Sequence, residues 1–148
     1  MLENIYKPSV MRTRFESSLI ALVSTALGLA LATVSEAAEV ELGKLPPAAT
    51  RPVDFAKDIE PIFANNCYSC HGPKRQESAL RLSVKADALK GGDEYGAKAI
   101  VPGKSSESVL IQAVAQVHPD LKMPKKGERL TAEQIGLLRA WIDQGAVW

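Results

Sequence analysis

Residues 67–71 read Cys67-Tyr68-Ser69-Cys70-His71, and this stretch holds both cysteines of the 148-residue chain. On a helix, residues three and four positions apart lie on the same side. The spacing therefore predicts that the two thiols and the imidazole point together toward one flat ligand.

Two thiols at this spacing, followed at once by a histidine, are typical of covalent haem attachment in c-type proteins. Each sulfur bonds to one side group of the porphyrin, and the adjacent imidazole binds the iron from below. We therefore predict one haem c, with Cys67 and Cys70 as the thioether sites and His71 as the proximal iron ligand.

Three other interpretations of this cluster stay open. A structural zinc ion needs four ligands, and His118 is the one histidine outside the cluster. A dithiol oxidoreductase places its first cysteine at the N-terminus of a helix, whereas Cys67 follows a predicted helix. A disulfide across so short a loop would contribute little chain entropy. Each of these fits the pattern less well than haem attachment does.

Upstream of the motif, the chain begins with a candidate leader. Residues 17–35 carry no charge and follow two arginines, a pattern that indicates a secretory signal. We expect a signal peptide over residues 1–37 and a translation start at Met11. The alternative is an uncleaved anchor, since about 19 uncharged residues would just span a bilayer. We expect a periplasmic or otherwise exported protein that meets a membrane only if the leader is retained.

Composition bounds the remainder of the chain. Residues 38–52 hold three prolines and no helical apolar spacing, which favours a linker. One domain over residues 53–148 then remains. The formal net charge of +1 and the 24% charged residues give no basic excess, which argues against a nucleic-acid partner. Strand-like alternation is scarce, so we predict an all-α domain.

Apolar residues at helical spacing predict four helices in this domain. They run into Cys67, over 83–90, from 105 to about 118, and from 131 to about 145. Asp58, Ser83 and Ser105 or Ser106 are the expected N-caps of the first three. For the last helix, Thr131 and Gln134 form a predicted capping box.

A polar loop over residues 118–129 separates the last two helices and contains Met123, the one methionine beyond the leader. If His71 binds the iron from one side, Met123 and His118 are the candidates for the other side. A thioether raises the reduction potential relative to a second histidine and favours electron transfer. The flanks of Met123 are polar rather than core-like, so we favour Met123 as the distal iron ligand and expect His118 at a helix end.

With both axial positions filled by protein, no coordination site is open to a substrate. We therefore expect an electron carrier that works by outer-sphere transfer, not an enzyme. The alternative is a haem-binding enzyme or sensor in which Met123 is labile. Lys122, Lys125 and Lys126 either form a positive rim for an acidic redox partner protein or are simply a solvated loop.

Seven stretches follow one another in a telling order: Asp54-Phe-Ala-Lys-Asp-Ile-Glu-Pro-Ile-Phe63, Cys67-Tyr-Ser-Cys-His-Gly72, Leu80-Arg-Leu82, Gly91-Gly92, Ile100-Val-Pro-Gly-Lys104, Met123-Pro124 and Leu138-Arg-Ala-Trp-Ile-Asp-Gln-Gly-Ala-Val-Trp148. Together they resemble the planctomycete-type cytochrome c domain, a branch of the class I cytochrome c-like group. The resemblance implies a small all-α fold around one covalently bound haem, with its first and last helices crossing. It also implies Cys67 and Cys70 as thioether sites, His71 as the proximal ligand and Met123 as the distal ligand.

Family members often carry this module at the front of larger proteins. The loop here reads Met-Pro-Lys-Lys, where Met-Pro-Pro is frequent in the family, and we expect ligation by Met123 to survive that change.

Overall fold

The computed structural model describes residues 40–148. The predicted signal peptide over residues 1–37 and the predicted start at Met11 lie outside this range. Within the described range the secondary structure is helical, with one isolated antiparallel bridge between His71 and Gln76 and no strand. The all-α prediction is confirmed. No helix in residues 40–148 is both long enough and apolar enough to cross a membrane.

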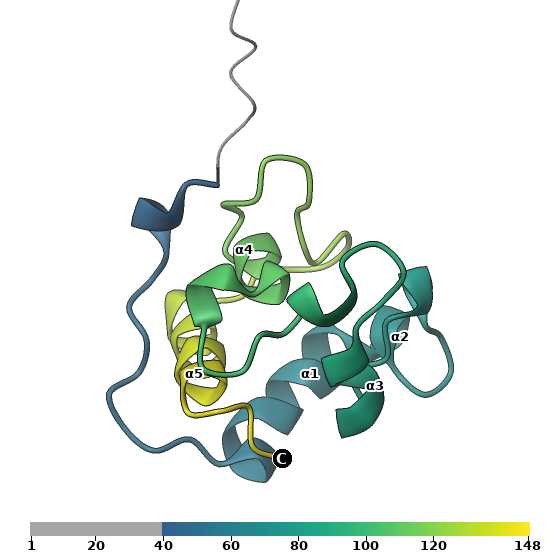
Figure 1. Ribbon diagram of the computed structural model, residues 1–148, viewed down its shortest axis with the longest axis horizontal. Coiled ribbons are helices and arrows are strands. Elements are labelled where there is room, and N and C mark those ends of the chain that lie inside the picture. Colours follow the sequence, from purple (N-terminus) through teal and green to yellow (C-terminus); the bar gives the residue numbers. More distant parts are fainter. Residues whose placement is uncertain (1–39) are drawn as a thin grey trace, which may run out of the picture. The chain divides into compact units, whose positions relative to one another are not determined.

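Five short helices follow in order (Figure 1): α1 (Glu60–Asn66), α2 (Tyr68–His71), α3 (Lys85–Lys90), α4 (Val109–Val114) and α5 (Ala132–Asp143). A π-helical turn, Phe55–Ile59, runs directly into α1. Further 3-10 turns lie at Leu42–Lys44, Glu77–Ala79, Gly96–Lys98 and Ser105–Glu107. Helices this short are unstable on their own, so packing between them must stabilise the fold.

The first helix starts earlier than the sequence predicted. Asp54, not Asp58, is its cap, because the Asp54 side chain accepts a hydrogen bond from the Lys57 backbone N–H at 2.9 Å. Asp58 instead accepts two hydrogen bonds from Arg51, at 2.9 and 2.8 Å, and one from the Asp54 N–H at 2.9 Å. The hydrogen bonds from Arg51 lower the pKa of Asp58 from 3.8 to about 2.

Two further cap predictions are wrong. Ser83 accepts a hydrogen bond from Arg81 Nε at 3.2 Å, and the Ser105 hydroxyl donates to Asp143 Oδ2 of α5 at 2.9 Å. The N-cap positions of α3 and α4 are instead held by Val84 and Ser108, and neither helix start has a side-chain cap, so Ser106 is not a cap either. The predicted end near residue 118 is wrong as well, because Gln116 has a left-handed backbone with φ of +62° and α4 stops before it.

The last helix matches its prediction. The Gln134 N–H donates to Thr131 Oγ1 at 3.2 Å, and the Thr131 N–H donates to Gln134 Oε1 at 2.9 Å, which is a complete capping box. The helix ends before Gly145, whose φ of +99° suits a residue without a Cβ.

Aromatic rings join the first and last helical segments. Trp141 of α5 lies 5.7 Å from Phe63 of α1 and 5.8 Å from Phe55, measured between ring centroids. Trp148 closes the cluster at 4.5 Å from Phe55. Trp141 and Phe63 are fully buried. Edge-on and tilted arrangements of this kind add to the burial of the rings themselves, so this cluster fixes α1 against α5.

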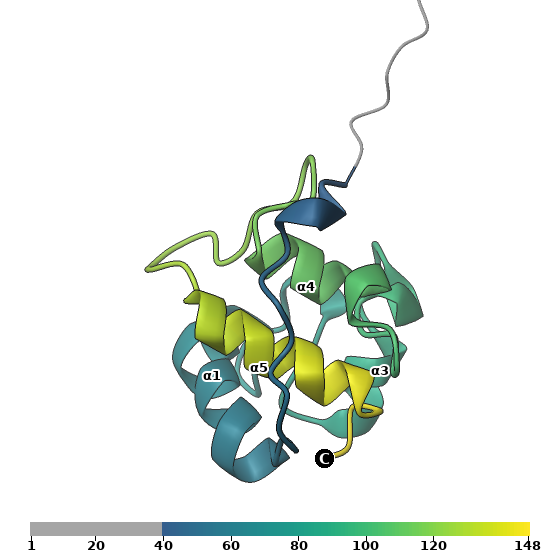
Figure 2. The ribbon, with the colours of Figure 1, turned by 90° about the vertical axis from the view of Figure 1, so that its left-hand side faces the viewer.

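The proline-rich segment predicted as a linker lies along the outer face of α5, which it crosses in Figure 2. The Ala49 N–H donates to the Gly136 carbonyl at 3.0 Å. Farther along, the side-chain amide of Gln144 donates to the Arg51 carbonyl at 3.0 Å. These contacts attach the segment to the domain over two turns of the helix and beyond.

Candidate functional site

The Cys-x-x-Cys-His turn follows α1 without a break. The Cys67 N–H donates to the Phe63 carbonyl at 2.8 Å, which ends α1. The N–H groups of Cys70 and His71 then both donate to the Cys67 carbonyl, at 3.0 and 2.8 Å. This tight turn, α2, brings Cys67, Cys70 and His71 to one cavity, as their spacing predicted.

The chain after His71 is held equally closely. The His71 carbonyl accepts a hydrogen bond from the Leu82 N–H, and the Gly72 N–H donates to the Arg75 carbonyl, both at 2.8 Å. Gly72 is itself a close-approach position, because a Cβ there would lie 2.3 Å from the Tyr68 carbonyl oxygen. The backbone around the imidazole is therefore fixed on both sides.

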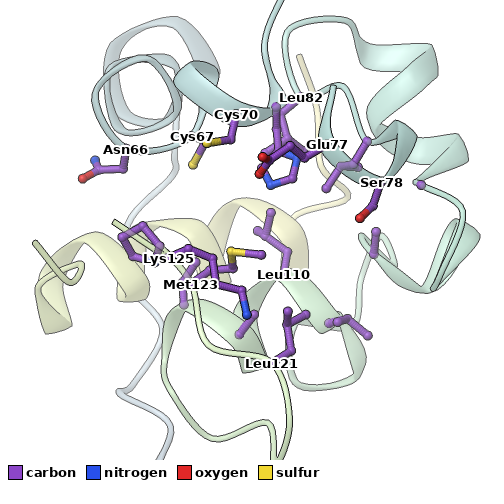
Figure 3. A pocket seen from close by; sticks show the side chains of 18 of the residues that line it. Asn66, Cys67, Cys70, Glu77, Ser78, Leu82, Leu110, Leu121, Met123 and Lys125 are labelled. Atoms are coloured by element: carbon purple, nitrogen blue, oxygen red, sulfur yellow. The ribbon is translucent and has the colours of Figure 1, made fainter. Parts of the chain in front are cut away.

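The cavity beside this turn measures about 290 Å³, at the low end of the range for ligand sites. Figure 3 shows Cys67 and Cys70 on one side of it and Met123 on the opposite side, with Leu110 and Leu121 near Met123. The lining is mostly apolar, and its hydrophobic members are Leu80, Leu82, Ala99, Val109, Leu110, Ala113, Val114, Leu121, Met123, Pro124 and Leu130.

Of the two candidates for the distal iron ligand, Met123 lines the cavity and His118 does not. The Met123 N–H donates to the Ala113 carbonyl of α4 at 3.1 Å. The His118 Nδ1 accepts hydrogen bonds from the backbone N–H groups of Asp120 and Leu121, at 3.2 and 3.1 Å. Contrary to the sequence prediction, His118 lies beyond the helix end and organises the loop that carries Met123.

Two thiols and one imidazole lie beside the apolar lining, which suits a largely apolar ligand that contains a metal ion. Burial, with a smaller contribution from Cys70, raises the pKa of the Cys67 thiol from 9.0 to about 12. Both thiols are free. Within residues 40–148, His71 Nδ1 is the buried side-chain nitrogen that has no hydrogen-bond partner, which is unusual for a polar atom. A flat porphyrin with a central iron fits these donors and the apolar lining.

Other metal sites fit less well. No group of three or more His, Cys, Asp or Glu side chains in the described part of the chain is arranged to hold a metal ion. The four-ligand zinc interpretation therefore finds no support in residues 40–148.

Charged residues lie at the rim of the cavity. In Figure 3, Lys125 lies on the Met123 side and Glu77 on the opposite side. Arg75, which forms an ion pair with Glu77, also lines the cavity, as do Glu94 and Lys126. Lys122 is not a lining residue. Of the three predicted rim lysines, two therefore lie at the cavity.

Several lining residues were missed by sequence reasoning. Tyr95 and Leu121 come from loops without apolar periodicity, and Ser78 comes from a turn in which it has a left-handed backbone with φ of +53°. Leu80 and Leu82 belong to the Leu80-Arg-Leu82 stretch, and their alternation could have indicated a shared face.

An all-α domain in which a Cys-x-x-Cys-His turn faces an apolar cavity is the arrangement expected of a c-type cytochrome. Residues 67–127 match the family model described as Planctomycete cytochrome C. The matched region runs from the cysteine motif through the Met123 loop, and the match bears out the predicted resemblance to the planctomycete-type cytochrome c domain. The match implies haem c as the cofactor. No curated protein and no solved structure matches the chain.

Proposed function

We propose that the protein is a monohaem c-type cytochrome that transfers electrons by outer-sphere relay. Cys67 and Cys70 would hold the haem through thioether bonds, His71 would be the proximal iron ligand and Met123 the distal one. The observation that carries this proposal is that His71 and Met123 line one cavity, whereas the side chain of His118 is used elsewhere. The haem supplies an iron that alternates between the ferric and ferrous states.

The residues around the cavity would set the conditions for that exchange. Apolar side chains keep water out, and a low-dielectric site favours the ferrous state because it carries less charge. A thioether ligand acts in the same direction. We therefore expect a higher reduction potential than two histidine ligands would give.

Two protein ligands leave no iron position for a substrate, which is why we propose an electron carrier. Lys125 and Lys126 are exposed at the rim, so a partner with an acidic surface could approach the cavity edge there. We also propose that the domain acts after export, in the periplasm or an equivalent compartment, where covalent haem attachment uses both thiols.

Exchanging one candidate distal ligand at a time tests this function. In protein matured with a cytochrome c assembly system, Met123→Ala should lower the reduction potential and let carbon monoxide bind rapidly to the reduced iron. The matched control, His118→Ala, should retain the wild-type absorption spectrum. An unchanged spectrum in Met123→Ala would remove Met123 from its role, and rapid carbon monoxide binding by the wild type would favour a haem sensor or enzyme instead.

Attachment itself has a separate test. Intact-mass measurement of the natively produced protein should show one haem per chain, retained through acid-acetone extraction. Two bare thiols with no added mass would refute the proposal.

A further inference from the structure

The C-terminal end of α4 and the Met123 loop are joined by the side chain of Gln116. Its amide nitrogen Nε2 donates to the Met123 carbonyl at 2.6 Å and to the Ala113 carbonyl at 3.1 Å. The N–H of Met123 donates to that same Ala113 carbonyl, at 3.1 Å. The backbone of Met123 is thus held at its N–H by Ala113 of α4 and at its carbonyl by Gln116, two residues beyond the end of α4.

The left-handed backbone of Gln116 indicates that a side-chain amide is needed at this position. Its φ of +62° lies in the left-handed region, which residues other than glycine, asparagine and aspartate adopt at a cost in free energy. The Lys122 ammonium donates to the Gln116 carbonyl at 2.6 Å and so supports this conformation. Glycine would suit the backbone better, but glycine would supply no amide to hold Met123.

We propose that Gln116 is a positioning residue for the distal iron ligand. By holding the backbone of Met123 against α4, it keeps the thioether at the cavity and lowers the fraction of molecules in which the loop has opened. The inference rests on the proposed function, since it requires Met123 to bind iron.

The side chains that hold the Met123 loop contact different parts of its backbone. Lys122 and His118 act on backbone groups before Met123, whereas Gln116 contacts Met123 itself. Losing the hydrogen bond from the Gln116 amide to the Met123 carbonyl should raise the population of the open loop by up to about tenfold.

Gln112 of α4, four residues before Gln116, provides a matched control. Its side-chain amide donates to the Ser106 carbonyl at 2.8 Å, so it also makes a hydrogen bond to a carbonyl but has none with Met123. Gln116→Glu and Gln112→Glu therefore make the same chemical change, in which an amide donor becomes a carboxylate facing a carbonyl oxygen. Gln116→Gly removes the amide while allowing the left-handed backbone, so it separates the loss of the donor from the new charge.

The test uses the haem-loaded protein and three measurements: the ferric charge-transfer band of iron bound to methionine sulfur, the reduction potential, and the rate of carbon monoxide binding to the reduced form. We expect Gln116→Glu and Gln116→Gly to bind carbon monoxide up to about ten times faster than the wild type and to weaken the band. Gln112→Glu should stay within about twofold of the wild-type rate.

Two results would overturn the inference, and they differ. If Met123→Ala abolishes the band while both Gln116 variants keep the wild-type band and carbon monoxide rate, Gln116 does not position the ligand and the proposed function stands. If Met123→Ala leaves the band unchanged, the proposed function fails and the inference fails with it.

Discussion

Gly72 follows the histidine of the motif, and replacing it with alanine should perturb the haem site and the fold together. A Cβ at this position would lie 2.3 Å from the Tyr68 carbonyl oxygen and 2.8 Å from the Tyr68 Cβ. Real Cβ atoms essentially never approach closer than 3.0 Å, so the α2 turn must open by at least 0.7 Å, the difference between 3.0 and 2.3 Å. The obstacle is backbone, and no side chain can rotate away to relieve it.

A forced backbone shift in a packed region costs roughly 1–3 kcal/mol. For a domain of this size, 1 kcal/mol lowers the melting temperature by about 4–8 °C. We therefore expect Gly72→Ala to melt roughly 5–20 °C below the wild type. Because the α2 turn ends at His71, the absorption spectrum of the bound haem should change as well.

The assay is thermal unfolding of the haem-loaded protein, followed by helical circular dichroism and by haem absorption. Gly43→Ala is the control, because a Cβ there would meet nothing within 4 Å, and its stability should stay within about 0.5 kcal/mol of the wild type. Should Gly72→Ala melt within 2 °C of the wild type by both probes, the steric argument is wrong and the turn is more adaptable than its hydrogen bonds suggest.

Two further expectations concern acid stability and the cofactor. The pKa of Asp58 is about 2 in the folded protein against an ordinary 3.8, so its contact with Arg51 contributes stability above pH 3.8 that is lost as the pH falls toward 2. The stability difference between the wild type and Asp58→Asn should shrink over that interval, and a difference that stays constant with pH would contradict the assignment. Haem-free protein should be partly unfolded, because the apolar cavity lining then loses its main contact; a single native-like calorimetric transition without haem would disprove this.

Local spacing made much of the structure predictable. The turn from Cys67 to His71 and the capping box of Thr131 and Gln134 each depend on residues at most four positions apart, so their geometry follows from helix periodicity alone. The buried face of α5 is predictable for the same reason.

The cap predictions that are wrong depend on hydrogen bonds with residues outside the helix start. Asp54 and Asp58 are both chemically able to cap a helix. The Asp58 carboxylate binds Arg51 instead, and Asp54 is the cap. Ser105 hydrogen-bonds to Asp143, 38 positions later in the chain. The prolines in residues 38–52 indicate that this segment is not helical. Nothing in the sequence indicates that the segment packs on the outer face of α5.

The His71 side and the Met123 side of the cavity therefore differ in which residues determine their structure. His71 reaches the cavity through a turn of five residues, in which the N–H groups of Cys70 and His71 donate to the nearby Cys67 carbonyl. Met123 reaches it through an irregular loop that depends on a left-handed Gln116 and on hydrogen bonds back to the end of α4. A single side-chain substitution can loosen that attachment without touching the attachment motif. If Met123 binds iron as proposed, the distal side is where sequence changes would adjust iron ligation without altering the Cys-x-x-Cys-His motif.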